Sequence, residues 1–559
     1  MLNKSKFIFV TGGVVSSLGK GVTAASLGAL LKEMGYKINI KKCDPYLNVD
    51  PGTMNPTQHG EVFITDDGYE TDLDFGHYER FLGQKMHGSS SITSGKIYTE
   101  LLSRERSGKY LGQTVQVVPH LVNLTKEFIT KDCADYDFNI IEIGGTVGDI
   151  EGNSFLETAR QMSMDTKKYE VMFIHVTLLP YIRVAEELKT KPTQHSVKTL
   201  MSSGILPNII VCRSEISVPK KIRQKIGLFC NVDEEDVIEM PDISSIYEAP
   251  ILLLKNKLDI RVMKHFNIKP KPKGSKFLKD WKNFDKKIKS AESSINVVII
   301  GKYGETFDPY KSVVEAIKAS AIHQGVKPNI KIISAANINA TNVDQLLHDI
   351  DAVVMAGGFG VNHIEDKIRA IKYIRENKIP FLGICLGMQL AIIEFCRNVL
   401  KIKDAGSTET NKNLSIDNAV VDVIKKLKSK NANVKYERAD NEFDGEMNLG
   451  ASNVEIKRGT LAHDIYGNNV ISERHRHRYQ IMPHYEEMIN EMGGIFSGTS
   501  EDLNLPEIFE LSTKESDKNS SPFFLCTQFH PEFNSTPLNP HPLFKKLIEV
   551  GMSLSQKNK

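Results

Sequence analysis

Short, fully apolar runs alternate with helical stretches through both halves of the chain, and this alternation constrains the fold most strongly. Residues 6–11 and 38–42 are such runs in the first half, and residues 295–300 begin the same pattern in the second. Apolar strands separated by helices are typical of parallel sheets covered on both faces. We therefore expect an α/β protein with two doubly wound, mostly parallel-sheet domains. Further strands are expected at 139–143, 171–177, 208–212, 250–254, 330–333, 352–356, 379–385 and 523–528, and helices at 22–34 and 181–189.

The length of the chain predicts at least two domains. It has 559 residues, whereas single cores stop growing near roughly 250–300 residues. A lysine-rich segment with two prolines lies near the middle, so we expect domains at 1–267 and 293–559 and a linker at 268–292. A polyanion-binding patch is the alternative for this segment, but two aspartates interrupt its positive charge, and Trp281 should pin it to a domain.

Composition excludes several classes of protein. Hydrophobic residues make up 40% and charged residues 25% of the chain, and the formal net charge is +2, as in an ordinary globular protein without a global field for nucleic acid or membranes. No apolar run approaches the roughly 20 residues of a membrane helix. The seven cysteines are scattered without a CxxC pair. We therefore expect neither disulfides nor zinc, and a reducing, cytoplasmic location.

A glycine-rich turn in the first half predicts phosphate binding. Residues 6–21 read KFIFVTGGVVSSLGKG, which is a strand, a turn and the start of a helix. This is the P-loop layout, in which backbone N–H groups and a lysine bind phosphate. The spacing departs from the usual pattern, and Gly21 replaces the hydroxyl residue that binds Mg²⁺, so a turn without a ligand is the alternative. Asp74 and Glu142 are the candidate metal ligands: Glu142 ends an apolar strand, where a carboxylate needs a cation, and Asp74 lies with Asp72 on one side of an expected extended segment.

A cluster of hydrogen-bond donors follows in the first half, at residues 187–198, which read ELKTKPTQHSVK. We expect Pro192 to end the preceding helix. Lys189, Lys191, Thr193 and Gln194 suit a triphosphate better than a single-stranded nucleic acid, because no aromatic residues are interleaved with them. The alternative is an exposed helix end, where the lysines interact with the negative end of the helix dipole.

The second half contains a nucleophile-elbow pattern with a cysteine. Cys385 lies in GICLG directly after an apolar strand, and the glycines allow a sharp turn into a helix whose N-terminus stabilises a thiolate. Gly357 and Gly358 follow another strand and offer N–H groups for an oxyanion hole. His530 and Glu532, two residues apart in QFHPEF, could activate the thiol and orient the imidazole. A buried structural cysteine and a core histidine are the alternatives.

These motifs carry a resemblance. The second half resembles the class I glutamine amidotransferases through GGFG, GICLGMQ, RHRHRY and QFHPEF. The chain as a whole is similar to the CTP synthase family, through VTGGVVSSLGKG, KKCDPYLNVDPGTMNPTQHGEVF, GYETDLDFGHYERF, EIGGTVGDIE and KTKPTQHSVK in the first half and GKYGETFDPYKSV in the second. The likeness extends nearly from end to end.

The resemblance implies a ligase that forms C–N bonds. ATP phosphorylates O4 of UTP, ammonia released from glutamine displaces the phosphate, and CTP is formed as the last step of de novo pyrimidine nucleotide synthesis. It also implies Mg²⁺ as cofactor, GTP as allosteric activator, CTP as inhibitor, a homotetramer, a cytoplasmic enzyme and a shielded passage for ammonia.

Residue roles follow from the same resemblance. Cys385, His530 and Glu532 would be catalytic, Asp74 and Glu142 would bind Mg²⁺, and His59 would gate the ammonia passage. The residues expected to bind ATP are Ser17, Leu18, Gly19, Lys20, Gly21, Lys42, Asp74, Arg213 and Asp242. Those expected to bind UTP or CTP are Ser16, Asp149, Ile150, Glu151, Lys189, Thr190, Lys191, Pro192, Thr193, Gln194 and Lys225. Those expected to bind glutamine are Gly358, Leu386, Gln389, Glu409 and Arg476.

The sequence also departs from the family pattern. Ala356 stands where a proline is common, residues 405–410 are shorter than the usual run around Glu409, and the polar loop at 512–521 is longer than usual. Two other hypotheses remain at this point: another P-loop amidotransferase of the cobyrinic-acid amidase type, and a nucleotide-switched scaffold related to partition ATPases with a degenerate glutaminase. The domain order weighs against the first, and the intact Cys385, His530 and Glu532 weigh against the second.

Overall fold

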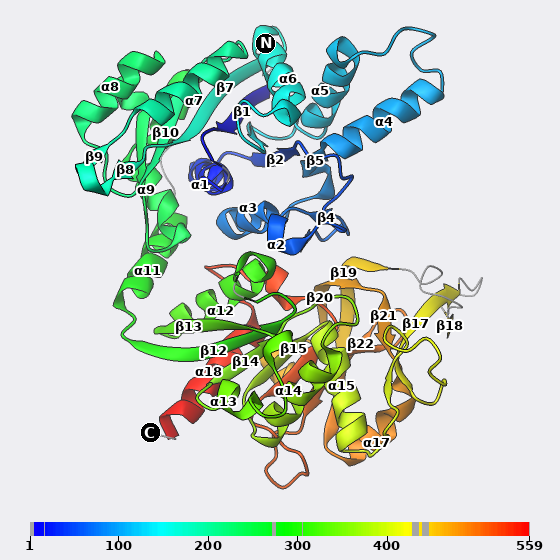
Figure 1. Ribbon diagram of the computed structural model, residues 1–559. Coiled ribbons are helices and arrows are strands. Elements are labelled where there is room, and N and C mark those ends of the chain that lie inside the picture. The colour runs from blue at the N-terminus through cyan, green and yellow to red at the C-terminus, as the bar shows by residue number, and fades with distance from the viewer. Residues whose placement is uncertain are drawn as a thin grey trace. The chain divides into compact units, whose positions relative to one another are not determined.

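The computed structural model in Figure 1 describes residues 5–15, 17–270, 276–304, 306–427, 435–438 and 447–557. The chain divides into two compact units. Unit 1 comprises Met1–Met54 and Asp74–Asp285, and unit 2 comprises Asn55–Leu73 and Lys286–Lys559. A segment from the first half of the sequence, residues 55–73, therefore packs as part of unit 2. Both units combine a large sheet with helices, which confirms the expected α/β class.

The sheet of unit 1 is fully parallel. Its seven strands run in the order β11-β10-β7-β1-β6-β2-β5, and every neighbouring pair is parallel. The strands are β1 (Ser5–Gly12), β2 (Ile38–Asp44), β5 (Ser91–Thr93), β6 (Phe138–Ile143), β7 (Tyr169–Leu178), β10 (Ile209–Ser214) and β11 (Val237–Pro241). Because the first strand lies in the middle, the carboxyl ends of β1, β6 and β7 meet at one edge, where doubly wound sheets bind ligands.

Helices cover both faces of this sheet. Phe7 and Phe9 of β1 join one apolar cluster with residues of α5 and α6, while α1 packs on the other side against α3 and α9 and against Ile40 of β2. The helices of unit 1 are α1 (Lys20–Glu33), α3 (Asp74–Leu82), α4 (Ser94–Arg106), α5 (Val122–Thr130), α6 (Asn153–Met164), α7 (Lys191–Ser202), α8 (Lys220–Cys230), α9 (Ala249–Lys255) and α10 (Leu258–His265). Because side chains alternate along β1, this strand contributes to an apolar core on each face of the sheet.

The sheet of unit 2 is mixed. Its nine strands run in the order β13-β12-β14-β15-β24-β23-β22-β19-β20. The pairs from β13 to β24 are parallel, and those from β24 to β20 are antiparallel. The strands are β12 (Ser293–Gly301), β13 (Val326–Ser334), β14 (Ala352–Met355), β15 (Phe381–Ile384), β19 (Asn448–Ile456), β20 (Val470–His477), β22 (Gly494–Ser500), β23 (Pro506–Leu511) and β24 (Phe524–Thr527).

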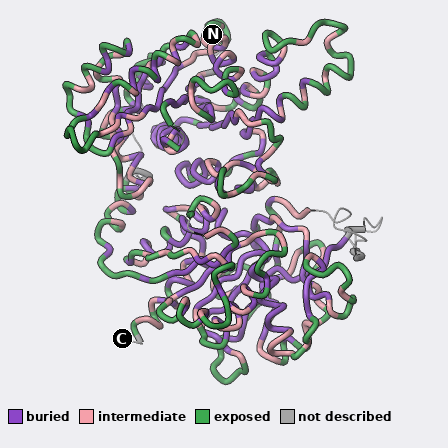
Figure 2. The backbone as a smooth tube through the Cα atoms, viewed as in Figure 1, coloured by how far each residue is buried: buried purple, intermediate pink, exposed green. Residues whose placement is uncertain are grey.

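Two apolar clusters lie on opposite faces of this sheet. Val297 and Ile299 of β12 pack with α12 (Lys311–His323) and α18 (Pro542–Lys557). Val298 and Ile300 pack with α14 (Ile364–Glu376) and α15 (Leu386–Asn398). Figure 2 shows that the buried residues lie mainly in the interior of each unit. The other elements of unit 2 are α2 (Pro56–His59), β3 (Phe63–Ile64), β4 (Glu70–Thr71), α13 (Val343–Leu347), β16 (Gly406–Ser407), β17 (Ala419–Leu427), β18 (Lys435–Arg438), α16 (Leu461–Tyr466), β21 (Tyr479–Ile481) and α17 (Glu486–Glu491).

Two expected elements are wrong. The strand expected at 250–254 is helix α9, because Pro250 occupies its first turn, where a missing N–H costs nothing. The helix expected at 181–189 is a short hairpin of β8 (Tyr181–Ile182) and β9 (Glu187–Leu188). Glu186 has a left-handed φ of 47°, which a continuous helix does not accommodate.

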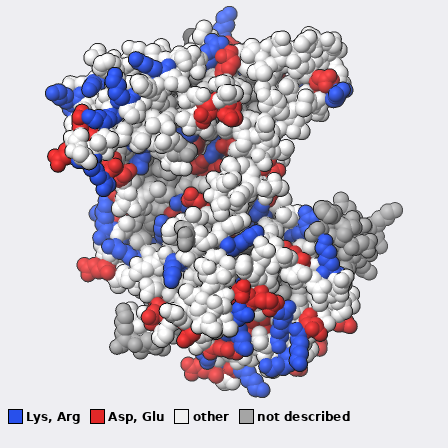
Figure 3. Space-filling view, viewed as in Figure 1, with Lys and Arg blue, Asp and Glu red and all other residues white. Residues whose placement is uncertain are grey.

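Charged and polar residues lie at the surface of the chain. Lysine, arginine and acidic side chains are interspersed over the face shown in Figure 3, as the small net charge suggests. The loop at 512–521 lies at the surface, and its ends are joined by a hydrogen bond from the N–H of Ser521 to the carbonyl of Ser512 at 2.9 Å.

The lysine-rich segment expected as a linker ends in a helix, α11 (Lys276–Ser290). Trp281 is fully buried, and its ring lies 5.5 Å from that of Phe81 and 5.7 Å from that of Tyr247. The expectation that Trp281 pins this segment to a domain is confirmed, since these partners belong to unit 1. The part of the segment at 271–275 lies outside the described residues.

Replacing Trp281 by alanine should remove this anchor. Truncation of a buried tryptophan costs about 3–5 kcal/mol, so we expect Trp281→Ala to lower the free energy of unfolding of unit 1 by that amount. Circular dichroism during urea unfolding measures the change, with Lys282→Ala, at an exposed neighbour, as the control. Equal midpoints for the two variants would contradict the anchoring role.

Candidate active sites

Cys385 lies in the sharp turn between β15 and α15 of unit 2. Its backbone has φ 53° and ψ −104°, a left-handed conformation that costs energy for any residue other than glycine. The chain can turn there because Gly387 has no side chain. A Cβ on Gly387 would lie only 2.7 Å from the carbonyl oxygen of Met355 in β14. The nucleophile elbow expected from the glycine spacing is therefore present.

A histidine and a glutamate lie beside this turn. The Nδ1–H of His530 donates a hydrogen bond of 2.8 Å to Oε1 of Glu532, and this bond fixes the ring and leaves Nε2 for another partner. A Cβ on Gly357 would lie 2.7 Å from Cε1 of His530 and 3.5 Å from Cβ of Cys385. Cys385 and His530 thus contact the same point of the backbone, at the glycine expected to form the oxyanion hole.

The charge state of His530 is set by its acidic neighbours. Burial alone would lower its pKa, but the neighbouring Glu532 and Cys385 side chains outweigh burial and raise the pKa of His530 to about 10. The imidazole therefore keeps its second proton at neutral pH. An imidazolium beside a sulfur can stabilise a thiolate and later donate a proton to a leaving amine.

The residues expected to bind glutamine surround the thiol. Leu386 follows Cys385 directly, and a Cβ on Gly358 would lie 3.9 Å from Cδ2 of Leu386. Gln389 donates to the carbonyl of Tyr479 at 3.2 Å, and Glu409 accepts the N–H of Gly360 at 3.0 Å. The guanidinium of Arg476 lies 4.8 Å from the ring centroid of Phe359, and the Arg476 carbonyl accepts the thiol of Cys385 at 3.7 Å. The structure brings this whole set together within unit 2.

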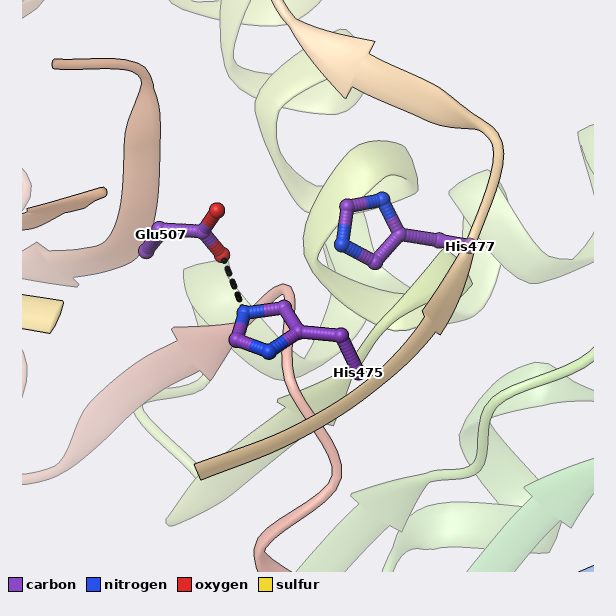
Figure 4. Close-up of side chains that lie close together, drawn as sticks. All are labelled: His475, His477 and Glu507. Atoms are coloured by element: carbon purple, nitrogen blue, oxygen red, sulfur yellow. Dashed lines mark hydrogen bonds and ion pairs between the residues drawn. The ribbon is translucent and has the colours of Figure 1, made fainter. Parts of the chain in front are cut away.

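A second group of potential metal ligands lies on the opposite face of β20. Figure 4 shows that Nε2 of His475 contacts Oε2 of Glu507, at 3.1 Å, with the ring of His477 beside them. The ligand atoms of these three buried residues lie within 4.8 Å of one another. Each histidine donates its Nδ1–H to a backbone carbonyl, of Glu473 or of Tyr479, at 3.0 Å. The donor types suit a divalent cation, and the hydrogen bond between His475 and Glu507 already ties β20 to β23.

The glycine-rich turn of unit 1 joins β1 to α1. Lys20, the first residue of α1, is 8% exposed, and its Nζ donates to the carbonyl of Gly145 at 2.8 Å. Burial lowers the pKa of Lys20, and the negative charge of Glu142 partly opposes this effect. Gly19 has a φ of 95°, which favours glycine at the helix start. The turn therefore presents a buried cation at the N-terminus of α1, as phosphate binding requires.

Two carboxylates face this helix start. Asp74 begins α3 and accepts a hydrogen bond from Lys42 of β2, and Glu142 near the end of β6 accepts one from Tyr78. A Cβ on Gly21 would lie 2.3 Å from Oδ1 of Asp74 and 3.3 Å from Oε2 of Glu142. Gly21, which replaces the usual hydroxyl residue, has no side chain, and the two carboxylates approach each other in the space that a side chain would fill.

Electrostatics favours a cation between these carboxylates. Burial and the nearby charge of Asp74 raise the pKa of Glu142, while Lys42 outweighs burial and lowers the pKa of Asp74. Two buried like charges repel each other, and a divalent cation relieves this repulsion. Carboxylate oxygens are the ligands that Mg²⁺ prefers. The residues present therefore fit a magnesium ion.

The donor cluster at 187–198 has a different structure from the one expected. Pro192 does not end a helix, because Lys191 and Pro192 form the first turn of α7. Proline is favoured there, since its missing N–H has no partner in a first turn. Thr190 accepts a hydrogen bond from Gln194 at 3.0 Å, and Thr193 donates to the carbonyl of Leu178 at 3.0 Å. The positive end of the helix dipole therefore lies among these donors and favours an anion.

The remaining predicted residues of unit 1 lie on loops and helix ends. Arg213 donates to Asp242 at 3.1 Å, and a Cβ on Gly19 would lie 3.9 Å from its Nε, so this pair lies beside the glycine-rich turn. Lys189 pairs with Glu187 at 2.6 Å. The other residues are Ser17 and Leu18 in the turn, Asp149, Ile150 and Glu151 after β6, and the exposed Lys225 on α8. Ser16 lies outside the described residues, and His59 ends α2 in unit 2.

Sequence reasoning missed several contacts. Gln528 donates to Sγ of Cys385 at 3.6 Å, and its place directly before the FHPEF string was a usable signal. His175 bridges Thr11, at 2.9 Å, and Ser196, at 2.8 Å, and so joins β1 to α7. Burial, with a smaller effect of Lys20, lowers the pKa of His175 to about 3, so the bridge is neutral. No motif marked this histidine.

Comparisons with known proteins cover the whole chain. The family model for the CTP synthase N-terminus matches residues 6–268, and that for class I glutamine amidotransferase matches residues 305–550. A CTP synthase of Caldanaerobacter subterraneus subsp. tengcongensis is 48% identical over 556 residues, 99% of both chains. That of Pelagibacter ubique is 49% identical over 548 residues, 98% of this chain and 99% of the relative. That of Methanocaldococcus jannaschii is 47% identical over 553 residues, 98% of each.

A solved structure is similar to part of the chain. The glutaminase domain of Trypanosoma brucei CTPS with bound acivicin is 30% identical, covers 46% of this chain and 94% of that one, and has a TM-score of 0.40. Among the described residues, no helix is long and apolar enough to cross a membrane. The full-length relatives decide against the two alternative families raised by the sequence. Since both halves and their order match, the chain belongs to the CTP synthase family, the glutamine-dependent ligases that convert UTP to CTP.

Proposed function

We propose that unit 2 releases ammonia from glutamine at Cys385 and that unit 1 uses this ammonia to aminate UTP. The observation that carries the proposal is the arrangement of Cys385, His530 and Glu532 around Gly357. The Cys385 thiolate attacks the amide carbon of glutamine, and N–H groups of Gly357 and Gly358 stabilise the oxyanion. His530 donates its proton to the departing ammonia, and water then hydrolyses the thioester. Gln389, Glu409 and Arg476 hold the substrate.

In unit 1, the carbonyl oxygen at position 4 of UTP attacks the γ-phosphorus of ATP, and ADP leaves. Ammonia then adds to C4, and the phosphate leaves. Lys20 and Lys42 hold the ATP phosphates, and the first turn of α7 holds the UTP triphosphate. Asp74 and Glu142 would hold a Mg²⁺ ion, which would supply positive charge to neutralise the phosphates.

The family resemblance also supports finer features of the proposal. It implies GTP as activator, CTP as inhibitor, a homotetramer, a cytoplasmic location and His59 at the ammonia passage. The domain boundaries at 267 and 293 belong to the same proposal.

Replacing Cys385 by alanine should separate the two reactions. We expect Cys385→Ala to abolish CTP formation from glutamine, because the nucleophile is gone, and to retain CTP formation from ammonium chloride. The assay mixes the enzyme with UTP, ATP and Mg²⁺ and measures CTP with either nitrogen source. Cys396→Ala, on the same helix, is the matched control and should keep both activities. Loss of both activities in Cys385→Ala would contradict the two-site scheme.

Replacing Lys20 by alanine should abolish both activities, because this change affects phosphoryl transfer itself. We expect no more than about 1% of the wild-type rate with either nitrogen source, since a charge-assisted contact to a buried phosphate is worth about 3 kcal/mol. Lys37→Ala, at an exposed lysine, is the control. Substantial ammonia-driven CTP formation by Lys20→Ala would exclude this role.

Replacing Glu142 by glutamine keeps the shape of the side chain and removes its charge. We expect the Mg²⁺ concentration for half-maximal, ammonia-driven CTP formation to rise about 10-fold or more, as for the loss of a group that holds a metal. The exposed Glu105→Gln is the control. An unchanged Mg²⁺ dependence would rule out Glu142 as a ligand.

A further inference from the structure

Residues 55–73, here called the strap, belong to unit 2 although they lie in the first half of the sequence. The family model for the CTP synthase N-terminus covers these residues, and the amidotransferase model, at 305–550, does not. Glu61 of the strap accepts the N–H of Ser312 at 2.7 Å, and the ring of Phe63 lies 5.0 Å from that of Phe533. The strap is thus an integral part of the glutaminase unit.

The strap also contacts β20, the strand beside the thiol. Arg474, which is fully buried, forms an ion pair with Asp66. The N–H of Ala451 donates to the carbonyl of Asp66 at 2.9 Å, which fixes the strap backbone on β19. Side chains alternate along a strand, so Arg474 and Arg476 point to the same face of β20. The strap lies along this face.

Glu70 of the strap forms an ion pair with Arg476. Its Oε1 accepts a hydrogen bond from Nε of Arg476 at 2.8 Å and lies 2.6 Å from Nη2 in the ion pair. The side chains are 17% and 16% exposed, so solvent screens this pair only in part. The ring of Phe359 lies against the same guanidinium at 4.8 Å. Arg476 is therefore held from two directions, by a carboxylate and by an aromatic ring.

These contacts fix the orientation of the Arg476 guanidinium. A guanidinium is planar and matches a carboxylate through a fork of N–H donors, and Glu70 holds this fork from the side of Nε. The backbone carbonyl of Arg476 lies 3.7 Å from Sγ of Cys385, and the ring against its guanidinium belongs to Phe359, the residue after Gly358, so the Arg476 side chain lies beside the expected oxyanion hole.

We propose that Glu70 is a positioning residue of the glutaminase site, which orients Arg476 to bind the α-carboxylate of glutamine. The inference rests on the proposed function, in which Arg476 holds glutamine. It assigns a role in the glutaminase reaction to a residue outside the amidotransferase part of the chain. Glu70 does not touch the reacting atoms. It acts through Arg476, whose fork it fixes before the substrate arrives.

The first experiment separates binding from chemistry in the full-length enzyme. We expect Glu70→Gln to raise KM for glutamine about 10-fold or more, because a charge-assisted hydrogen bond fixes the group that binds it, while kcat changes less than about 3-fold. Glu70→Asp, which keeps the charge, should restore part of the loss. The exposed Glu455→Gln on β19 is the matched control. An unchanged KM in Glu70→Gln would overturn the proposal.

The second experiment asks whether Glu70 acts through Arg476. Arg476→Ala should raise KM for glutamine, and Glu70→Gln should add no further effect in that background. Glutamine amide, which lacks the α-carboxylate, should be hydrolysed equally well by wild type and Glu70→Gln. An additive double variant, or an equal loss with glutamine amide, would overturn the role of Glu70. If Arg476→Ala leaves KM unchanged, the proposed function of Arg476 itself fails. Circular dichroism melting confirms that each variant is folded.

Discussion

The backbone at Cys385 is the constraint on which the glutaminase chemistry depends. A left-handed φ at a cysteine is costly, and it persists because β15, β24 and the start of α15 fix the turn from all sides. The N–H of Cys385 donates to the carbonyl of Thr527 at 2.6 Å, and β24 then continues directly to Gln528 and His530. The packing of β15 against β24 therefore both holds Cys385 in its strained conformation and places Gln528 and His530 beside its thiol.

Local chemistry in the sequence was sufficient to predict this part of the molecule. The apolar strands, the glycine-rich turns and the FHPEF string each have a short-range physical cause, and the structure brings Cys385, His530 and Glu532 together as expected. The errors have equally local causes. A proline after a helical pattern predicts the end of that helix, but proline is also favoured in the first turn of the next helix, where Pro192 lies, and only the downstream residues distinguish the two cases.

Long-range contacts could not be predicted in this way. The pairs Glu70–Arg476 and Asp66–Arg474 join residues about four hundred positions apart, and no periodicity or spacing signals such a contact. The same holds for the bridge through His175, which depends on how β1 and α7 pack. The lysine-rich segment was predicted only in part. Its tryptophan indicates an anchor, which is present, but its many lysines favour a solvated linker, whereas most of the segment is helix α11.

The strap has a consequence for the order in which the chain folds during synthesis. Glu61 is made 251 residues before Ser312, and Asp66 is made 408 residues before Arg474. At about 5–20 residues per second, the strap waits roughly 20–80 s for its partner on β20. Unit 1 can complete its parallel sheet during this interval, because all seven strands precede Lys286. Unit 2 therefore completes its fold last, by packing against the strap, which is one of the first segments to be synthesised.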